Sequence, residues 1–273
     1  MSTQDVHPTA VVEAGARVGE GCRIGPYVVI GPAVELGDNV VVHAHAVIGG
    51  NTSIGDATVI HAHAVIGGPP QDLKYLGSDT TLRVGQRNLI REGVTINTGT
   101  EQGGGETIVG DDNIIMANAH VAHDCIIGNG CIVANNVMLA GHVVVEDGVN
   151  LAGGAGVHHF ATVGKYAYIG GLTRLTRDAP PYTIVEGHPM RVRGVNVVGL
   201  KRAGLDDVTI KAIKDCFKML FKSDDPLTES VDKARAEFAG IDEVIYMINF
   251  VEASNAGRQG RQEEDPGRDL MGG

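Results

Sequence analysis

The octapeptide HAHAVIGG occupies residues 43–50 and recurs without change at residues 61–68. The first copy begins at His43 and the second at His61. An identical repeat at so short an interval indicates that the chain returns periodically to the same structural environment. The question it raises is what kind of structure has that period.

Aliphatic residues stand at every sixth position on both sides of this repeat. The first run comprises Val6, Val12, Val18, Ile24, Ile30, Leu36, Val42, Ile48, Ile54, Ile60 and Ile66. The pattern resumes at Val84, Ile90 and Ile96, and a third run extends from Val109 to Leu175. A period of six is neither the 3.6 of a helix nor the 2 of a plain strand, and it is typical of hexapeptide repeats in a parallel β-helix. Three hexapeptides make one coil, which equals the offset between the two octapeptides, and successive coils lie about 4.8 Å apart.

The [LIV]-G-x-x-x-x pattern, with a small or β-branched residue four positions after the aliphatic, resembles the hexapeptide acyltransferases. Their coils form a left-handed triangular prism, and the resemblance implies that hand here. We therefore expect a mainly β protein: a left-handed parallel β-helix over residues 1–190, with loops at 67–83 and 97–108 where the repeat is interrupted. The loop at 97–108 is Gly-rich and lacks a phosphate-loop pattern, which favours a flexible lid or an inter-subunit arm.

A change of pattern follows the last repeat. A Pro pair at 180–181 ends the regular coils, and apolar residues at helical spacing then predict helices over 206–222, 227–238 and 241–254. We expect a small C-terminal α-helical domain at 191–256 and a disordered, polar, Gly-rich tail at 257–273.

Composition narrows the function classes. The chain has 22 Lys and Arg against 33 Asp and Glu, which gives no reason to expect binding to nucleic acid. The sequence contains no apolar run long enough to cross a bilayer and no secretory signal, so we expect no membrane span and a cytoplasmic location. Its four cysteines lack CxxC spacing, and Cys125 and Cys131 fall at inward positions of the repeat, which predicts core packing.

The histidines of the repeated octapeptide are expected to stack. His43 lies one coil before His61, and His45 one coil before His63. No carboxylate or cysteine of the octapeptide completes a metal-ligand set. The pattern therefore favours a ladder of like side chains facing solvent or a neighbouring subunit.

A second group of histidines lies in NAHVAHDC at 118–125, in GH at 141–142 and in VHHF at 157–160. Counting one coil at a time places His123 beside Gly141 and Gly141 beside His159, and it places Asp124 beside His142. A His next to Asp suits proton transfer, and a Gly backbone N–H one coil away suits an oxyanion. From these residues alone a structural cluster, an acid–base site and a zinc site like that of γ-class carbonic anhydrases all remain open.

Five segments resemble the UDP-N-acetylglucosamine O-acyltransferases, which catalyse the first step of lipid A synthesis. They are QDLKYLG at 71–77, INTGTEQGGGET at 96–107, NAHVAHDC at 118–125, LAGHV at 139–143 and GVNVVGLKRAG at 194–204. The resemblance extends from about residue 6 to about residue 255 in matching order and spacing.

This resemblance implies a catalytic set of His123, Asp124 and Gly141. By this resemblance His123 would be the general base for the sugar 3-hydroxyl, Asp124 would orient it, and the Gly141 N–H would stabilise the oxyanion. The acyl donor would be a 3-hydroxyacyl group on acyl carrier protein. The resemblance also implies a homotrimer and no cofactor or metal.

The resemblance further implies which residues bind substrate. The expected set is Gln71, Asp72, Lys74, Asn97, His120, His142, His158, His159, Asn196 and Arg202. Asp72 and Lys74 would contact the sugar nucleotide, and Asn196 and Arg202 its phosphate–uridine end, although either of the last two residues has a helix cap as its alternative role. Gly171 matches the position that sets acyl-chain length, where Gly leaves more room than Met.

Several positions depart from the family pattern. They are Asn97 and Thr98 in place of His and Arg, His159 in place of Gln, Val198 in place of an acidic residue, and Ala203 in place of Arg. These changes surround the expected sugar and nucleotide sites, so a 3-amino sugar or another UDP-sugar stays open as acceptor. A non-catalytic β-helix scaffold and the related N-acyltransferase also stay open.

A set of basic residues near the C-terminal end forms a candidate docking surface for the acidic carrier protein. It comprises Arg174, Arg177, Arg191, Arg193, Lys201, Arg202, Lys211, Lys214 and Lys218.

Overall fold

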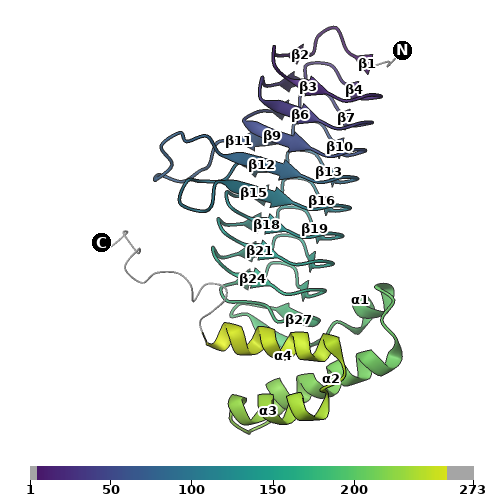
Figure 1. Cartoon of the computed structure of the whole chain (residues 1–273), viewed down its shortest axis with the longest axis vertical. Helices are drawn as coiled ribbons and strands as arrows, with labels where there is room; N and C mark the ends of the chain where they lie inside the picture. The colour runs from purple at the N-terminus through teal and green to yellow at the C-terminus, as the bar shows by residue number, and fades with distance from the viewer. Residues whose placement is uncertain (1–4, 257–273) are drawn as a thin grey trace.

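The chain winds into a three-sided prism that is followed by a short helical segment (Figure 1). This computed structural model describes residues 5–256. Strands three apart in sequence pair in parallel, which builds three sheets of 11, 9 and 8 strands. We call them sheets A, B and C in the order in which the chain visits them, and we call the turns between them the A–B, B–C and C–A corners.

The strands are short, and most contain two residues. Sheet A consists of β1 (Asp5–Val6), β4 (Arg23–Ile24), β7 (Val41–Val42), β10 (Val59–Ile60), β13 (Leu89–Ile90), β16 (Ile114–Ile115), β19 (Ile132–Val133), β22 (Asn150–Leu151), β25 (Tyr168–Ile169), β27 (Thr183–Glu186) and β28 (Arg191–Val195). Sheet B consists of β2 (Val11–Val12), β5 (Val29–Ile30), β8 (Val47–Ile48), β11 (Val65–Gly68), β14 (Thr95–Asn97), β17 (His120–Val121), β20 (Met138–Leu139), β23 (Gly156–Val157) and β26 (Arg174–Leu175). Sheet C consists of β3 (Arg17–Val18), β6 (Val34–Leu36), β9 (Asn51–Ile54), β12 (Thr81–Val84), β15 (Glu106–Val109), β18 (Ile126–Ile127), β21 (Val144–Val145) and β24 (Thr162–Val163).

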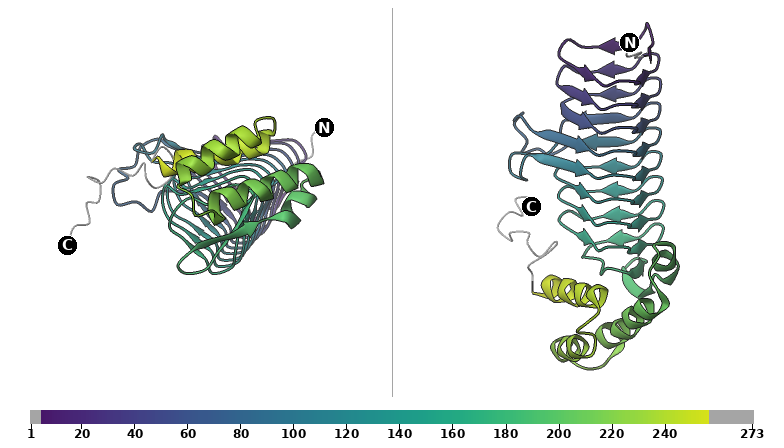
Figure 2. Two further views of the ribbon diagram at one scale, coloured as in Figure 1. Left: turned by 90° about the horizontal axis from the view of Figure 1, so that it is seen from below. Right: turned by 45° about the vertical axis from the view of Figure 1, so that its right-hand side comes forward.

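The aliphatic residues of the six-residue period fill the interior of the prism. Ile66 pairs with Ile48 on one side and with Ile96 on the other, and all three are 0% exposed. Uninterrupted coils pair residues separated by three hexapeptides, as Ile127 with Val145. The core is therefore a stack of aliphatic layers, and its coils are seen end-on in Figure 2.

Two loops lengthen coils without breaking this stack. The β11–β12 loop covers residues 69–80, and the β14–β15 loop covers residues 98–105. Pairing resumes in register after each loop, with Ile60 opposite Ile90 and Val84 opposite Val109. Both loops project from the same side of the prism (Figures 1 and 2). They coincide with the predicted interruptions at 67–83 and 97–108, trimmed by residues that extend the adjoining strands.

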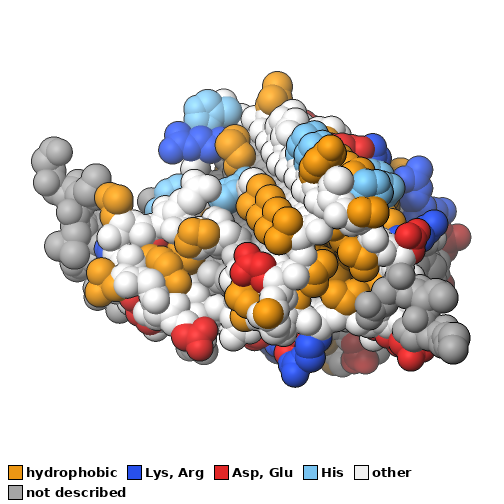
Figure 3. All heavy atoms as spheres, turned by 90° about the horizontal axis from the view of Figure 1, so that it is seen from above, with side chains coloured by type: hydrophobic (Ala, Val, Ile, Leu, Met, Phe, Trp, Pro, Cys, Tyr) orange, Lys and Arg blue, Asp and Glu red, His pale blue; other side chains and the backbone are white. Residues whose placement is uncertain are grey.

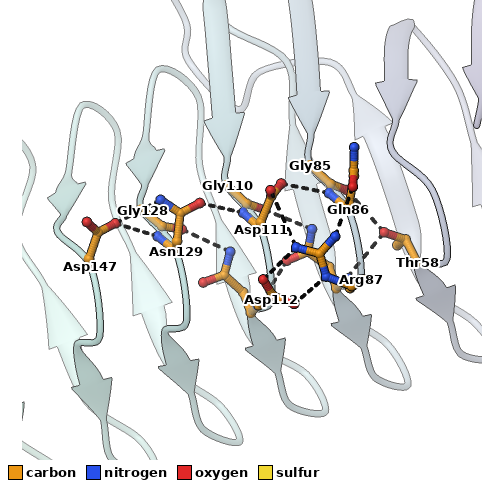
Figure 4. A network of polar contacts seen from close by, with 12 residues as sticks. Thr58, Gly85, Gln86, Arg87, Gly110, Asp111, Asp112, Gly128, Asn129 and Asp147 are labelled. Atoms are coloured by element: carbon orange, nitrogen blue, oxygen red, sulfur yellow. Dashed lines mark hydrogen bonds and ion pairs between the residues drawn. The ribbon is translucent and has the colours of Figure 1, made fainter. Parts of the chain in front are cut away.

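Side-chain oxygens cap the backbone at the C–A corner. Asp147 Oδ1 accepts a hydrogen bond from Asn129 N at 2.8 Å, and Asn129 Oδ1 accepts one from Asp111 N at the same distance. Asp111 Oδ1 in turn accepts one from Gln86 N, again at 2.8 Å. Figure 4 shows this ladder running from coil to coil. It satisfies corner N–H groups that no strand can reach.

The helical segment closes the C-terminal end of the prism. It contains α1 (Val197–Arg202), α2 (Asp207–Lys222), α3 (Leu227–Glu237) and α4 (Asp242–Asn255). Asp206 caps α2 by accepting hydrogen bonds from Val208 N and Thr209 N, as expected for a helix start. Buried residues such as Leu200, Ile213 and Met247 pack the helices together. Within the described residues no helix is both long and apolar enough to span a membrane.

The helices match the three that the sequence predicts, and α1 is an additional one. The strand β28 lies in the segment 191–256 assigned to the helical domain, where it pairs antiparallel with β27 and extends sheet A. The predicted disordered tail at 257–273 lies outside the described residues.

The stacked histidines of the repeated octapeptide are confirmed. The rings of His43 and His61 lie 4.8 Å apart between centroids, and those of His45 and His63 lie 5.1 Å apart. Tyr27 stacks on His45 one coil earlier. Core packing of the cysteines is also confirmed, and burial raises the pKa of Cys125 and of Cys131 to about 12.

The strand β18 offers a matched test of the layered core. Ile127 is 1% exposed and Ile126 is 44% exposed. Replacing Ile127 by Ala should lower the free energy of unfolding by about 2–5 kcal/mol because a cavity remains. Replacing Ile126 by Ala should cost less than about 1 kcal/mol. Denaturation followed by circular dichroism measures both losses, and equal losses would contradict the assignment of faces.

Candidate active site

His123 and Asp124 form a hydrogen-bonded pair at the B–C corner. His123 Nδ1 lies 2.7 Å from Asp124 Oδ2, and the side chains are 12% and 1% exposed. An ionised carboxylate accepts only, so His123 Nδ1 carries the proton and donates it. In the neutral ring His123 Nε2 then carries the lone pair, which is the tautomer required of a general base.

Asp124 is held from both ends of the β14–β15 loop. Thr100 N and Thr100 Oγ1 donate to its carboxylate at 2.8 and 2.7 Å. Thr107 Oγ1 accepts from Asp124 N at 2.8 Å, which fixes a backbone that lies in the left-handed region at φ 58°. Burial acts to raise the pKa of Asp124, but the hydrogen bonds from His123 and Thr100 outweigh it and hold the pKa below its ordinary value. The carboxylate is therefore kept ionised beside His123.

Gly141 lies directly against the His123 ring. A Cβ at position 141 would lie 2.4 Å from His123 Cε1 and 2.6 Å from Nε2, so any side chain here would displace the imidazole. The backbone N–H of Gly141 has no hydrogen-bond acceptor among the described residues. A free N–H beside the basic nitrogen is what an oxyanion site needs. The predicted juxtaposition of His123 and Gly141 is confirmed.

Further histidines surround this pair. His142 stands edge-on to His123 with ring centroids 5.1 Å apart, and its Nε2 lies 3.8 Å from Asp124 Oδ2. His142 also stacks on Phe160 at 4.4 Å. Burial lowers the pKa of His142 and of His120, which favours their neutral forms near neutral pH. When His142 and His120 are neutral, His123 is the histidine that pairs with the negative charge of Asp124.

A cavity of about 560 Å³ opens in front of the pair. It is lined by Gln71, His120, Ala122, His123, Met138, Leu139, Ala140, Gly141, Gly156, Val157, His158, Arg174 and Leu175. One end holds the histidines, and the rest runs along sheet B over small and apolar residues. Such a shape suits a substrate with a polar reacting end and an apolar chain.

The β11–β12 loop brings one expected residue, Gln71, to the lining of this cavity. The next residue, Asp72, lies outside the lining, and its charge acts on His142. Lys74 lies in the same loop, where its backbone N–H donates to Asp72 Oδ1 at 2.9 Å.

The side chains of His158 and His159 are in ring contact, with centroids 3.8 Å apart.

Four of the expected residues are held by contacts outside this cavity. Asn97 is 5% exposed; its Nδ2 donates to Gly68 O at 3.4 Å and its Oδ1 has no partner among the described residues. Asn196 Oδ1 caps α1 by accepting from Gly199 N, while its Nδ2 donates to Tyr166 O at the C–A corner. Arg202 belongs to α1. Gly171 lies at the A–B corner, beside Gly153 O. None of these four lines the cavity in front of His123.

The sequence does not predict two contacts of Asp124, those with Thr100 and Thr107. Counting by coils finds neighbours only across uninterrupted coils. Thr100 lies 24 residues before Asp124 and across a loop, so no periodic signal pairs them.

The donor set also allows a test of the zinc-site alternative. Ligand atoms of His123, Asp124 and His142 lie within 4.8 Å of one another. However, Asp124 Oδ2 already accepts hydrogen bonds from His123 and Thr100, and Oδ1 accepts one from Thr100 N. A metal ion would have to displace these hydrogen bonds, so the arrangement fits proton transfer better than a metal centre.

Comparison with known proteins identifies both parts of the fold. A family model described as bacterial transferase hexapeptide matches residues 33–68 and 106–141. A model described as domain 2 of UDP-N-acetylglucosamine O-acyltransferase matches residues 178–259. Together they agree with the predicted left-handed β-helix and its C-terminal helices.

Whole-length relatives carry one name. Acyl-[acyl-carrier-protein]–UDP-N-acetylglucosamine O-acyltransferases of Rhizobium johnstonii and Rhizobium etli are 47% and 48% identical to this chain, each over 92% of both chains.

Solved structures agree with them. LpxA, a UDP-N-acetylglucosamine acyltransferase from Bacteroides fragilis, superposes with a TM-score of 0.90 at 38% identity, over 93% of this chain and 98% of its own. The UDP-N-acetylglucosamine acyltransferase of Arabidopsis gives 0.82 at 33% identity, over 93% and 99%. The chain belongs to the family of acyl-[acyl-carrier-protein]–UDP-N-acetylglucosamine O-acyltransferases.

Proposed function

We propose that this protein transfers a 3-hydroxyacyl group from acyl carrier protein to the 3-hydroxyl of UDP-N-acetylglucosamine, the first step of lipid A synthesis, in the cytoplasm. The observation that carries the proposal is the His123–Asp124 pair, whose free Nε2 faces Gly141 in a cavity with an apolar extension. Family membership supplies the substrate class.

The geometry supports a general-base mechanism. His123 Nε2 takes the proton of the sugar 3-hydroxyl as its oxygen attacks the thioester carbon. The negative charge that develops on the carbonyl oxygen is stabilised by the Gly141 N–H. Collapse of the tetrahedral intermediate forms the ester and breaks the carbon–sulfur bond, and the departing thiolate takes the proton back from His123. Asp124 keeps Nε2 available as acceptor and stabilises the imidazolium.

Substrate contacts follow from the surroundings of the pair. Gln71 and Asp72, from the β11–β12 loop, and Lys74 beside them would bind the sugar nucleotide. His120, His142 and His158 would surround the acceptor sugar. The acyl chain would lie along sheet B over Met138 and Gly156, which line the same cavity.

The outer faces of the prism support a homotrimer. Sheet B presents Val11, Val29, Val47 and Val65, and sheet A presents Val41, Val59, Leu89, Ile114 and Ile132. Sheet C instead presents Arg17, Glu35, Ser53 and Arg83 in the N-terminal coils. Rows of hydrophobic side chains are visible from the N-terminal end (Figure 3). In the N-terminal coils, two apolar faces and one polar face suit a closed ring, in which each copy uses a different face toward each neighbour.

Such an assembly would also bring Gly171 and Asn196 of one copy toward the His123–Asp124 pair of another. Gly171 lies at the A–B corner and Asn196 is bound to the C–A corner, whereas the pair lies at the B–C corner. They would reach the acyl chain and the uridine end only from a neighbouring copy. For Asn196 the alternative role as a helix cap is present in the structure.

The proposal also specifies that the acceptor atom of the sugar is the oxygen of a 3-hydroxyl and not the nitrogen of a 3-amino group. Asn97, where the family pattern has His, is buried, and His159 contacts Phe160 and His158. Both positions differ from the family pattern, yet the pair itself is complete. The alternative acceptor is a 3-amino UDP-sugar, on which the same base would yield an amide.

Carrier-protein docking would use the basic residues of the C-terminal end. Several of them are paired with acids: Arg193 with Glu186, Lys201 with Asp207, and both Lys211 and Lys218 with Asp215. Arg174 lines the cavity itself and is the best-placed contact for the arriving acyl carrier.

The first test measures thiol release from 3-hydroxyacyl carrier protein with UDP-N-acetylglucosamine and with its 3-amino analogue. We expect turnover with the hydroxy sugar, and a loss of at least about 10²-fold in His123→Ala because the general base is removed. Turnover with the amino sugar alone would establish the alternative acceptor. No release with either sugar, with metal content at stoichiometry, would favour the zinc-site alternative; no release and no metal would favour a scaffold.

A second test uses the glycine beside the base. In Gly141→Ala the new methyl group would displace the His123 ring, so kcat should fall by about 10²-fold or more while the fold is kept. Gly49→Ala is the matched control, because its Cβ would meet nothing nearer than Gly67 O at 3.9 Å. Full activity in Gly141→Ala would refute this placement of the base.

A third test addresses the trimer. The wild-type protein should have three times the chain mass of 28.5 kDa by light scattering. Val47→Lys, on the apolar face of sheet B, should lower that mass, whereas Ser53→Lys, on the polar face of sheet C in the same coil, should not. A monomeric wild type, or equal behaviour of the two variants, would contradict the assembly.

A further inference from the structure

The β14–β15 loop is folded onto the catalytic pair. Gly103 packs so closely against Asp124 that a Cβ at position 103 would lie 2.1–2.4 Å from the three atoms of the carboxyl group. Thr100 is 2% exposed, and its carbonyl oxygen accepts from Gly103 N and Gly105 N at 3.1 and 2.8 Å. The expectation of a flexible lid therefore does not describe the inner part of this loop. Its residues Thr100 and Gly103 pack against Asp124 and form the wall behind it.

The direction of the Thr100 hydroxyl proton follows from its neighbours. Gly103 N donates to Thr100 Oγ1 at 3.1 Å, so that oxygen acts as an acceptor toward the loop. Its own proton then points to Asp124 Oδ2 at 2.7 Å, because an ionised carboxylate cannot donate. Asp124 Oδ2 consequently receives two donors, Thr100 Oγ1 and His123 Nδ1, while Oδ1 receives Thr100 N.

Three hydrogen bonds thus fix the plane of a carboxylate whose side chain is 1% exposed. Rotation of that plane would move Oδ2 away from His123 Nδ1 and change the direction of Nε2. Among the described side chains, Asp124 alone forms a hydrogen bond with the His123 ring. The orientation of the base therefore depends on Asp124, and the orientation of Asp124 depends on Thr100.

We propose that Thr100 is a positioning residue for catalysis, which acts through Asp124 to hold His123 in the direction needed to accept the proton of the acceptor sugar. Gly103 assists by allowing the loop to close on the carboxylate. The inference rests on the proposed function, since it concerns the same acyl transfer. It adds a second threonine contact to the one by which Thr107 holds the backbone of Asp124.

This role predicts a particular kinetic signature. Thr100 does not line the cavity in front of His123, so its loss should leave substrate binding unchanged. Base catalysis should weaken, because the imidazole is less well directed. The expected result is a lower kcat at nearly constant KM.

The role also predicts a change in the pH profile. The Thr100 hydrogen bonds help to hold the pKa of Asp124 below its ordinary value. Without the hydroxyl the pKa of Asp124 rises, so its charge is lost at a higher pH as the pH falls. The other titratable groups that face it are His123 and His142, and Asp72 acts on His142. The part of the acidic limb of kcat that reflects protonation of Asp124 should therefore move to higher pH.

The test compares Thr100→Val with Thr100→Ser in the full-length protein, using acyl transfer to UDP-N-acetylglucosamine. Val keeps the shape and the backbone N–H but lacks the hydroxyl. We expect Thr100→Val to lower kcat by about 10-fold or more with KM within about twofold, and to shift the acidic limb upward. Thr100→Ser, which restores the donor, should return kcat to within about threefold of wild type.

The outcomes separate the two proposals. An inactive wild type would overturn the proposed function itself. An active wild type with an equally active Thr100→Val, or with a raised KM and an unmoved acidic limb, would overturn the positioning role alone. If Thr100→Val fails to fold, as judged by its melting temperature, Gly103→Ala takes its place: the methyl group displaces Asp124, so lower kcat at constant KM supports the role and unchanged kcat contradicts it.

Discussion

Each coil after the first buries one aliphatic side chain from each of its three strands, and the rest of the structure depends on that constraint. Stacking those side chains brings equivalent positions of successive coils into register, as Ile48 and Ile66 show. Corner residues are then aligned as strictly as core residues. Such alignment turns a sequence interval of three hexapeptides into spatial contact.

The surroundings of the His123–Asp124 pair follow this alignment only in part. Register alone places Gly141 against His123 and His142 beside Asp124. The support of Asp124 comes instead from Thr100 in the β14–β15 loop and from Thr107 in β15. A regular solenoid offers a flat face with little enclosure, and an inserted loop supplies the wall that keeps the carboxylate dry and ionised. The proposed active site thus lies where a loop is added to a stack that stays in register.

The sequence predicted the features that follow from its six-residue period. The parallel β-helix, the two loops, the buried Cys125 and Cys131, and the contact of His123 with Gly141 all follow from counting positions. Features that do not follow from this period could not be predicted by counting positions. The hand of the prism came from a family resemblance, Thr100 was hidden by the loop between it and Asp124, and β28 escaped because its antiparallel pairing with β27 leaves no six-residue repeat.

The proposed mechanism requires that His123 holds its proton on Nδ1, hydrogen-bonded to Asp124. Its Nε2 is then available to act as the base. The most direct measurement is proton NMR of the protein labelled with ¹⁵N-histidine, in which His123→Ala identifies the signal among 11 histidines. The expected result is a downfield proton on Nδ1 of His123 that is lost in Asp124→Ala, with Nε2 unprotonated in the neutral ring. A proton on Nε2 in the neutral ring, or an Nδ1 signal indifferent to Asp124, would contradict it.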